Sequence, residues 1–341
     1  MVEIAGPATG IDSLPVDTIR WGIIGCGDVT EVKSGPGFQK ARGSALVAVM
    51  RRDAAKAEDY ARRHGVPRWY TDAEALVADP NVDAVYIATP PSSHERYTRL
   101  AAAAGKPVYV EKPLALDHAE CRAMIDACAA AGVPLFTAYY RRAMPRFLRI
   151  KALLDAGAIG TVRAVAITVC RAFTPPPGPL PWRVDPAISG GGLFVDQASH
   201  QLDLLDFFLG PITETDGVAG NQGGLYAAED IVAATFGWDA GARGTGLWSF
   251  SAWGDTDRTE IVGTRGRVLY ATFSEAPVIL ETDAGFESLD LPCPAHAQQP
   301  LIQTIVDELL TGTPSCPSTA ASAARTTRVI DTLLATHYAA G

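Results

Sequence analysis

The sequence has few cysteines, no long apolar run and no excess of positive charge, and each shortage excludes a class of protein. Its six cysteines form no C-x-x-C pair and no Cys/His spacing suited to zinc, so we predict reduced thiols and no metal site. No run approaches transmembrane length, and the net charge of -9 argues against a nucleic acid or an anionic membrane as partner. A composition of 48% hydrophobic and 20% charged residues is typical of a soluble globular protein.

The first residues, 1–17, are acidic and contain no apolar core of signal-peptide length. We therefore expect a loose N-terminal tail and a cytoplasmic protein. The 341 residues exceed what one hydrophobic core usually supports, so two domains are expected. A change of pattern near residue 140 places these domains at 18–140 and 141–341.

The first domain alternates short apolar runs, bounded by Gly, Pro or Asp, with stretches of helical spacing. This alternation predicts a parallel sheet with helices on its faces. The predicted strands are residues 19–24, 45–50, 83–88, 107–110 and 134–137, and the predicted helices are 53–64, 72–78, 92–104 and 117–131.

The second domain contains longer β-like runs separated by Gly or Asp turns, which predict an open, mostly antiparallel sheet in an α+β domain. A proline-rich loop at 174–181 is expected to form a rigid wall or lid. The predicted strands are 161–171, 230–238, 242–253, 259–262 and 267–272, and the predicted helices are 145–156, 193–209 and 318–338. Residues 242–253 are apolar on both faces, which favours one face against helices and the other against a second subunit.

A glycine-rich turn follows the first predicted strand. Gly25 and Gly27 stand where that strand must turn into a helix, so backbone amides can approach a pyrophosphate. The third position of G-x-G-x-x-G is Thr30, which either loosens the packing of helix on strand or places a hydroxyl near the phosphate. We predict that the cofactor contacts Gly25, Cys26, Gly27, Asp28 and Val29.

The end of the second strand carries Arg51 and Arg52 where an NAD-binding protein would carry an acidic residue. Two guanidinium groups can pair with the 2′-phosphate of NADP and stack on its adenine. The alternative is a solvated turn, because neighbouring Asp53 and Lys56 are charged as well. The absence of the carboxylate favours NADP over NAD.

Two further motifs place polar residues where a ligand could bind. Lys112, between Glu111 and Pro113, lies at the carboxyl end of a predicted strand, the edge at which open α/β sheets bind ligands; otherwise it is an ordinary surface lysine. Gly190-Gly191-Gly192 precedes a helix in which Asp196, His200 and Asp203 share one face. We read this as a polar ridge behind a flexible turn, although a dipole-stabilising aspartate and a buried core histidine would look similar. His94 is the second candidate histidine, because it opens a helix at the same sheet edge.

Taken together, these segments resemble the glucose-fructose oxidoreductase, inositol dehydrogenase and rhizopine-catabolism family, Gfo/Idh/MocA. The resemblance runs from about residue 18 to the C-terminus. It is carried by residues 21–27, by 83–90 with His94, by 111–113, by Arg142 with Pro145, and by 190–192 with Asp196 and His200. It implies a Rossmann-like first domain and a second domain whose open sheet often makes dimers, hence a homodimer or homotetramer.

The resemblance also implies roles for single residues. Lys112 would lie near the nicotinamide and the reacting carbon, His200 would be the general acid/base, and Asp196 would orient the substrate or tune its neighbours. Further cofactor contacts would come from Thr89, Pro90, His94 and Glu111, and further substrate contacts from Arg142, Trp182 and Arg183.

Within the family, Trp182-Arg183 and Arg51-Arg52 look most like NADP-using members that act on sugars, cyclitols or related diols and ketones. We therefore expect an NADP(H)-dependent oxidoreductase that transfers hydride to or from a secondary alcohol, ketone or hemiacetal carbon. Two alternatives remain open: an NAD-assisted glycoside hydrolase of the same superfamily, and a non-catalytic NADP-binding sensor.

Overall fold

The computed structural model describes residues 17–339, so all but the last residue of the predicted N-terminal tail lies outside the described chain. The chain divides into two compact units. The first contains the residues up to Ala115, together with Ala119–Ala143 and Pro294–Ala323. The second contains Leu116–His118, Met144–Cys293 and the residues from Ala324 onward.

The first unit is built on a six-stranded sheet in the order β3-β2-β1-β4-β5-β6, in which every pairing is parallel. The predicted parallel sheet is confirmed, and a short strand, β3, adds to it at one edge. The strands are β1 (Ile19–Ile24), β2 (Ser44–Met50), β3 (Arg68–Tyr70), β4 (Ala84–Ile87), β5 (Val108–Val110) and β6 (Leu135–Thr137).

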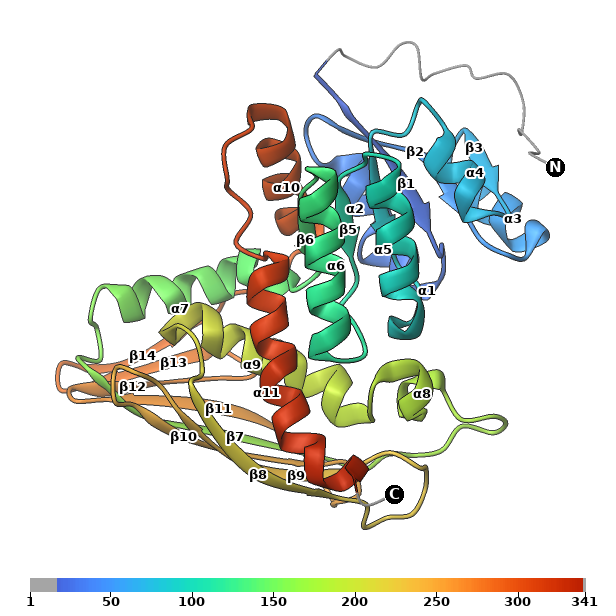
Figure 1. The fold of residues 1–341 in the computed structure, drawn as a ribbon. Coiled ribbons are helices and arrows are strands. Elements are labelled where there is room, and N and C mark those ends of the chain that lie inside the picture. The colour runs from blue at the N-terminus through green and yellow to red at the C-terminus, as the bar shows by residue number, and fades with distance from the viewer. Residues whose placement is uncertain (1–16, 340–341) are drawn as a thin grey trace. The chain divides into compact units, whose positions relative to one another are not determined.

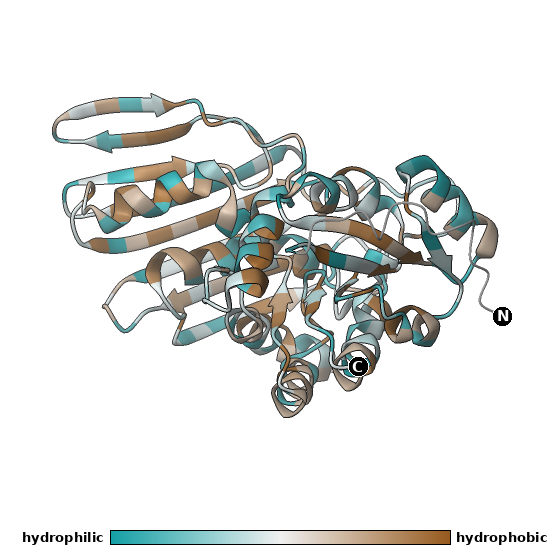
Figure 2. Ribbon diagram, turned by 90° about the horizontal axis from the view of Figure 1, so that it is seen from above, coloured by the Kyte–Doolittle hydropathy of each residue, from teal (hydrophilic) through white to brown (hydrophobic). Residues whose placement is uncertain are grey.

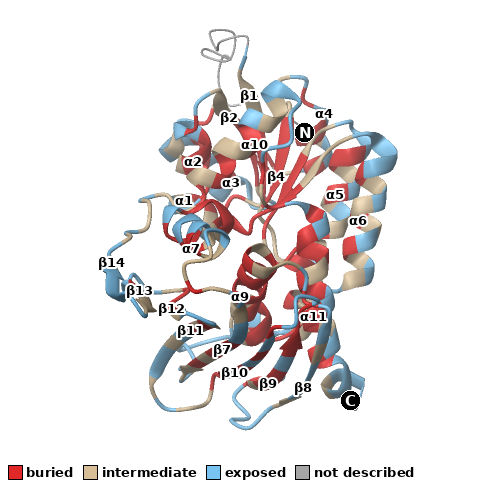
Figure 3. Cartoon of the chain, turned by 90° about the vertical axis from the view of Figure 1, so that its left-hand side faces the viewer, coloured by how far each residue is buried: buried red, intermediate tan, exposed pale blue. Residues whose placement is uncertain are grey.

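These strands form because their residues are apolar on both sides and can be buried on both faces. All four residues of β4 and all three of β5 are buried, and Figure 3 shows the strands in red between helices with exposed outer surfaces. The helices of this part of the chain are α1 (Asp28–Val32), α2 (Gly35–Lys40), α3 (Ala54–His64), α4 (Ala73–Ala78), α5 (His94–Ala103) and α6 (His118–Ala131).

Residues 294–323, which the sequence places in the second domain, are grouped with the first unit. They contain helix α10 (Gln299–Thr311), whose Ile302 packs so close to Gly37 of α2 that a Cβ there would lie 2.9 Å from its Cδ1. Strand residue Phe136 also bridges to Thr319. The sequence pattern does not show that residues 294–323 return to the first unit, because this return depends on contacts between residues far apart along the chain.

The second unit is built on an eight-stranded sheet in the order β14-β13-β12-β11-β7-β10-β9-β8. The pairing of β10 with β7 is parallel and the other pairings are antiparallel, as expected for a mostly antiparallel sheet. The strands are β7 (Val162–Arg171), β8 (Glu214–Gly220), β9 (Ile231–Gly237), β10 (Arg243–Ser249), β11 (Asp255–Gly263), β12 (Gly266–Tyr270), β13 (Val278–Thr282) and β14 (Gly285–Leu289).

One face of this sheet is covered and the other is open. In Figure 1, helices α7 (Pro145–Asp155), α9 (Leu193–Leu209) and α11 (Ala320–Ala339) lie on the same side of it. Side chains therefore alternate along the strands, as with buried Val165, Ile167 and Val169 against exposed Ala164 and Ala166. Figure 2 shows hydrophobic and hydrophilic residues following one another along several of the strands. Between residues 17 and 339, no helix is both long and apolar enough to cross a bilayer.

Candidate active site

The glycine-rich turn after β1 is shaped by the sheet itself. Gly25 has a φ of 93°, and a Cβ there would lie 2.7 Å from Cγ2 of Thr89, so this position requires glycine. The amides of Gly25 and Cys26 donate to the carbonyl of Met50, at 2.9 and 3.2 Å. Cys26 is buried, which raises the pKa of its thiol to about 11. Its thiol is therefore neutral, and its backbone amide and carbonyl are both engaged, by Met50 and Arg51.

Gly27 differs from Gly25, because its missing side chain leaves space. A Cβ there would meet no described atom closer than the carbonyl oxygen of Gly25, at 3.9 Å. Helix α1 begins at the next residue, and the amides of Asp28 and Val29 have no acceptor within the helix. Open space beside these amides fits the phosphates of a dinucleotide.

Thr30, which replaces the third glycine of the motif, closes the turn. Its hydroxyl donates to the carbonyl of Gly27 at 2.7 Å and accepts from the Gly27 amide at 3.1 Å. Its carbonyl accepts the hydroxyl of Tyr60 at 2.9 Å. The side chain is fully buried, and its hydroxyl is engaged within the turn.

The two arginines after β2 are placed differently. Nη1 of Arg51 donates to the carbonyl of Cys26 at 3.1 Å, which brings this guanidinium to the glycine turn. Arg52 is exposed, and Asp53 caps helix α3 by accepting the amide of Lys56 at 3.2 Å. Of the pair predicted to bind a 2′-phosphate, Arg51 is the one held beside the turn.

His94 is buried, with no exposed surface. Its Nε2 lies 2.7 Å from the carbonyl of Thr89, and its Nδ1 lies 3.1 Å from the carbonyls of both Pro113 and Leu114. Burial lowers the pKa of the ring. The imidazole predicted to contact cofactor therefore ties the segment after β4, which includes Thr89 and Pro90, to the segment after Lys112.

Lys112 and Glu111 follow β5 directly. Lys112 is half-buried, whereas Glu111 is buried, with an exposed fraction of 8%. Oε2 of Glu111 accepts the backbone amide of Lys112 at 3.1 Å. Arg142 is also buried in this unit, where its Nη1 donates to the carbonyl of Pro317 at 3.2 Å, and its part in substrate binding stays a prediction.

In the second unit, the triple glycine before α9 is tightly packed, which corrects the expectation of a flexible turn. A Cβ on Gly190, whose φ is 80°, would lie 2.6 Å from the carbonyl oxygen of Leu116. A Cβ on Gly191 would lie 2.4 Å from Cγ2 of Val195, and one on Gly192 would lie 2.6 Å from the carbonyl oxygen of Glu229. Glycine is required here because the protein fills the space.

Glu229 is a buried carboxylate that the sequence analysis missed. It accepts the amide of Gly192 at 2.7 Å and the hydroxyl of Tyr338 at 2.6 Å, and so holds the start of α9. Burial raises the pKa of this carboxyl. An acidic pair, Glu229-Asp230, in a loop gives no sequence signal that separates it from a surface turn.

Helix α9 carries the predicted polar ridge. Oδ2 of Asp196 lies 3.9 Å from Nε of Arg183, whose guanidinium stands 4.5 Å from the ring of Trp182. His200 is 4% exposed, and its ring centroid lies 6.0 Å from that of Phe273. The structure thus brings Trp182, Arg183 and Asp196 together and places His200 one turn further along the same helix.

Arg171, at the end of β7, is a second residue the sequence analysis missed near this helix. It donates to Gln197 of α9 at 3.1 Å and to Asp255 at 2.9 Å, and its guanidinium lies 5.2 Å from the centroid of Phe273. Arg171 and His200 therefore flank the same aromatic ring.

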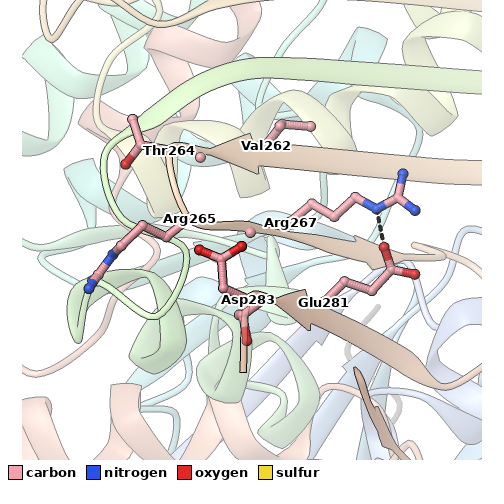
Figure 4. Close-up of a pocket in the computed structure, with 9 residues that line it drawn as sticks. Val262, Thr264, Arg265, Arg267, Glu281 and Asp283 are labelled. Carbon is pink, nitrogen blue, oxygen red and sulfur yellow. Dashed lines mark hydrogen bonds and ion pairs between the residues drawn. The ribbon is translucent and has the colours of Figure 1, made fainter. Parts of the chain in front are cut away.

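A hollow of about 350 Å³ opens beside the turn between β11 and β12, and Figure 4 shows its charged lining. Its Arg267 is paired with Glu281 at 2.5 Å and with Glu260 at 2.9 Å. None of the lining residues, which lie within 262–267 and 281–283, belongs to the predicted site.

Comparisons with known proteins give the family. Residues 19–139 match the profile of the oxidoreductase family with an NAD-binding Rossmann fold, and residues 147–269 match the GFO/IDH/MocA C-terminal domain. The chain is 39% identical to oxidoreductase P35 of Formosa agariphila over 321 residues, which cover 93% of this chain and 99% of that protein.

Two further comparisons, one with a relative and one with a solved structure, agree with these matches. Inositol 2-dehydrogenase of Rhizobium meliloti is 31% identical over 279 residues, covering 79% of each chain. The structure of a levoglucosan dehydrogenase with NADH and levoglucosan has the same fold, with a TM-score of 0.84 at 22% identity, covering 95% of this chain and 98% of that one. With both of its parts matched in order, the chain belongs to the Gfo/Idh/MocA family of nicotinamide-dependent oxidoreductases.

Proposed function

We propose that the protein is an NADP(H)-dependent oxidoreductase of the NADP-using branch of its family. Its substrate would be a secondary alcohol, ketone or hemiacetal carbon of a sugar, cyclitol or related diol. The observation that carries the cofactor choice is the guanidinium of Arg51 on the carbonyl of Cys26, beside the open space at Gly27. The inositol 2-dehydrogenase relative supports the substrate class.

In this proposal the phosphates bind at Gly25, Gly27 and the first amides of α1, and Arg51 pairs with the 2′-phosphate. The nicotinamide, when bound, supplies or accepts the hydride. His200 takes the hydroxyl proton of an alcohol or returns it to a ketone oxygen. Lys112 stabilises the negative charge that develops on that oxygen.

The substrate contacts are proposed on α9 and on the segment that precedes it. Asp196 accepts hydrogen bonds from substrate hydroxyls, and Arg183, 3.9 Å away, fixes the direction of that carboxylate. Trp182 offers an apolar ring face of the kind that packs against the C–H groups of a sugar. Trp182 is half-buried.

The test is a panel of aldoses, ketoses, cyclitols, osones and aromatic diols, assayed with NADP⁺ and NADPH by nicotinamide absorbance. We expect turnover of at least one member with NADP(H), faster than with NAD(H). Tight NADPH binding without turnover of any substrate would instead favour the non-catalytic sensor. Glycoside cleavage that needs NAD would favour the hydrolase.

The open face of the eight-stranded sheet supports a second proposal, a homodimer or homotetramer. Leu247 and Val218 are 39% and 69% exposed, and both stand in register with Ala233 between them. Apolar side chains across neighbouring strands form a patch that a second copy would cover. Light scattering at micromolar concentration should give a multiple of the monomer mass, and Leu247→Arg should lower it; a wild-type monomer would contradict the proposal.

A further inference from the structure

Glu111 is a buried carboxylate next to the lysine on which the proposed function depends. Oε1 accepts the side-chain amide of Gln298 at 2.6 Å and also the hydroxyl of Tyr86, while Oε2 accepts the backbone amide of Lys112 at 3.1 Å. Both oxygens are thus engaged by donors of the protein. A buried anion with three donors is stabilised without a ligand.

The donors of this network have a fixed polarity. Burial, together with the charge on Glu111, raises the pKa of Tyr86 well above its ordinary value, so its hydroxyl keeps its proton. A carboxylate can only accept, so Gln298 must turn Nε2 toward Glu111 and Oε1 away from it. That oxygen accepts the hydroxyl of Tyr109 at 2.9 Å. Each of these side chains therefore has one orientation.

Gln298 comes from the returning segment, 187 residues beyond Glu111. It has no exposed surface, its backbone amide donates to the carbonyl of Lys33 at 3.3 Å, and it immediately precedes α10. The network consequently joins three parts of the first unit: strands β4 and β5, the turn after β5, and the segment at 294–323.

We propose that Glu111 and Gln298 are positioning residues, which fix the peptide between Glu111 and Lys112 and so direct the lysine side chain. This inference rests on the proposed role of Lys112. It assigns Glu111 a task other than the cofactor contact implied by the sequence. It also explains why the chain returns to the first unit, since the return supplies the amide that holds Glu111.

The experiment is a double-mutant cycle between Gln298→Met and Lys112→Met. Gln298→Met removes the amide and keeps the length of the side chain. It should lower kcat about 10- to 100-fold, as for a catalytic group moved by about 1 Å, and leave the dissociation constant for NADPH unchanged. In the Lys112→Met background the same change should lower the residual rate no further, because its effect passes through Lys112.

Gln303→Met is the matched control. It makes the same substitution in the same returning segment and removes hydrogen bonds to the amide and carbonyl of Arg42, at 2.8 and 3.2 Å, and to Asp307, at 2.8 Å. None of these partners belongs to the network of Glu111. It should leave kcat unchanged. If Gln298→Met does not fold, Tyr86→Phe removes one donor to Glu111 while keeping the ring, and it should show the same non-additivity with Lys112→Met.

The outcomes separate the two ideas. If Lys112→Met itself keeps the wild-type rate, the proposed role of Lys112 fails. If Lys112→Met is slow and Gln298→Met is fast, or if Gln298→Met slows both backgrounds by the same factor, the positioning role is overturned. An equal loss from Gln303→Met would also overturn it, because α10 would then matter only as a whole.

Discussion

In each unit, one helix of the candidate site starts from a glycine in extended conformation, and the surroundings of the two glycines differ. Gly27 caps α1 with a φ of -147°, and Gly192 caps α9 with a φ of -106°. A Cβ on Gly27 would meet open space, whereas one on Gly192 would lie 2.6 Å from the backbone oxygen of Glu229. The same residue in the same role leaves room for a ligand in one unit and is filled by the protein in the other.

The largest expected effect compares one proposed catalytic residue from each unit. Lys112→Met and His200→Ala should each lower turnover by about two to four orders of magnitude, the range for a lost acid/base or charge-stabilising group. NADPH binding should survive both changes, because the proposed phosphate contacts lie on the glycine turn and Arg51. Steady-state kinetics and NADPH titration by fluorescence measure the two quantities.

The dependence of turnover on pH tests the proton-transfer role of His200 separately from the role of Lys112. If His200→Ala folds, binds NADPH and turns over substrate near the wild-type rate across the pH range, its proton-transfer role is wrong. The double variant should be little slower than either single variant if Lys112 and His200 act together in the same chemical step. Fully additive losses would place them in separate steps.

The next effect concerns cofactor choice, which we assign to the first unit alone. Arg51→Ala should weaken NADPH binding by about 1.5–3 kcal/mol, the usual value of a hydrogen bond to a charged group, and leave NADH binding nearly unchanged. Arg52→Ala should do less, because Arg52 is exposed and only Arg51 reaches the turn at Cys26. Arg183→Ala, in the second unit, is the control: it should change the KM for substrate and not the ratio of the two cofactors. An unchanged ratio in the double variant of Arg51 and Arg52 would refute the NADP assignment.

Adding a single methyl group to Gly192 or to Gly27 tests the comparison between these two glycines. Gly192→Ala should lower the free energy of unfolding by about 1–3 kcal/mol, as overpacking does, because a backbone atom blocks the new methyl. Gly27→Ala should leave stability nearly unchanged, since both space and φ permit alanine, and should weaken NADPH binding. Urea denaturation measures the free energy of unfolding of each variant, and titration with NADPH measures its dissociation constant. Equal destabilisation by both would mean that Gly27 serves packing and leaves no room for a phosphate.

The sequence predicts the parts of the molecule that depend on local pattern. Five of the six parallel strands are found because they are buried on both faces, whereas the three-residue edge strand β3 is missed. Helix α9 is found with its bounds because Gly192 and Gly210 flank an apolar periodic stretch. Strands β8, β13 and β14 are missed: β8 and β14 are the two edge strands and are poor in β-branched residues, and β13 has only five residues. Helix α2 is missed because Gly35-Pro36-Gly37 is typical of a turn.

The candidate site divides in the same way. Motif residues such as Gly25, Arg51 and Lys112 are found from their place after a strand. Gln298 and Glu229 are not found, because their importance comes from partners 187 and 37 residues away. No local spacing encodes such contacts, and a buried carboxylate looks like a surface one until its donors are known.

The smallest expected effect compares two glutamates whose pKa values move in opposite directions. Hydrogen bonds from Arg63, at 2.7 and 2.8 Å, lower the pKa of Glu31 on α1 from its ordinary 4.5 to about 2. Burial raises the pKa of Glu229 beside α9. Glu31 therefore contributes stability that is present above pH 4.5 and is lost as the pH falls toward 2. Glu229 contributes stability that is present in acid and is lost as the pH rises from its ordinary value toward the raised one.

Glu31→Gln should lower the free energy of unfolding by about 1 kcal/mol at neutral pH and by less in acid, since the side chain is 34% exposed and solvent screens the pair. Glu229→Gln keeps a group of the same shape on Gly192 and Tyr338, and removes a charge that is costly to bury. Relative to the wild type it should gain stability as the pH rises from acid to neutral. Urea midpoints of the three proteins along a pH series measure both slopes. The prediction is contradicted if the stability of both variants, relative to the wild type, changes in the same direction with pH. Glu229 would then ionise as easily as a surface carboxylate, and the two glutamates would not differ as their surroundings suggest.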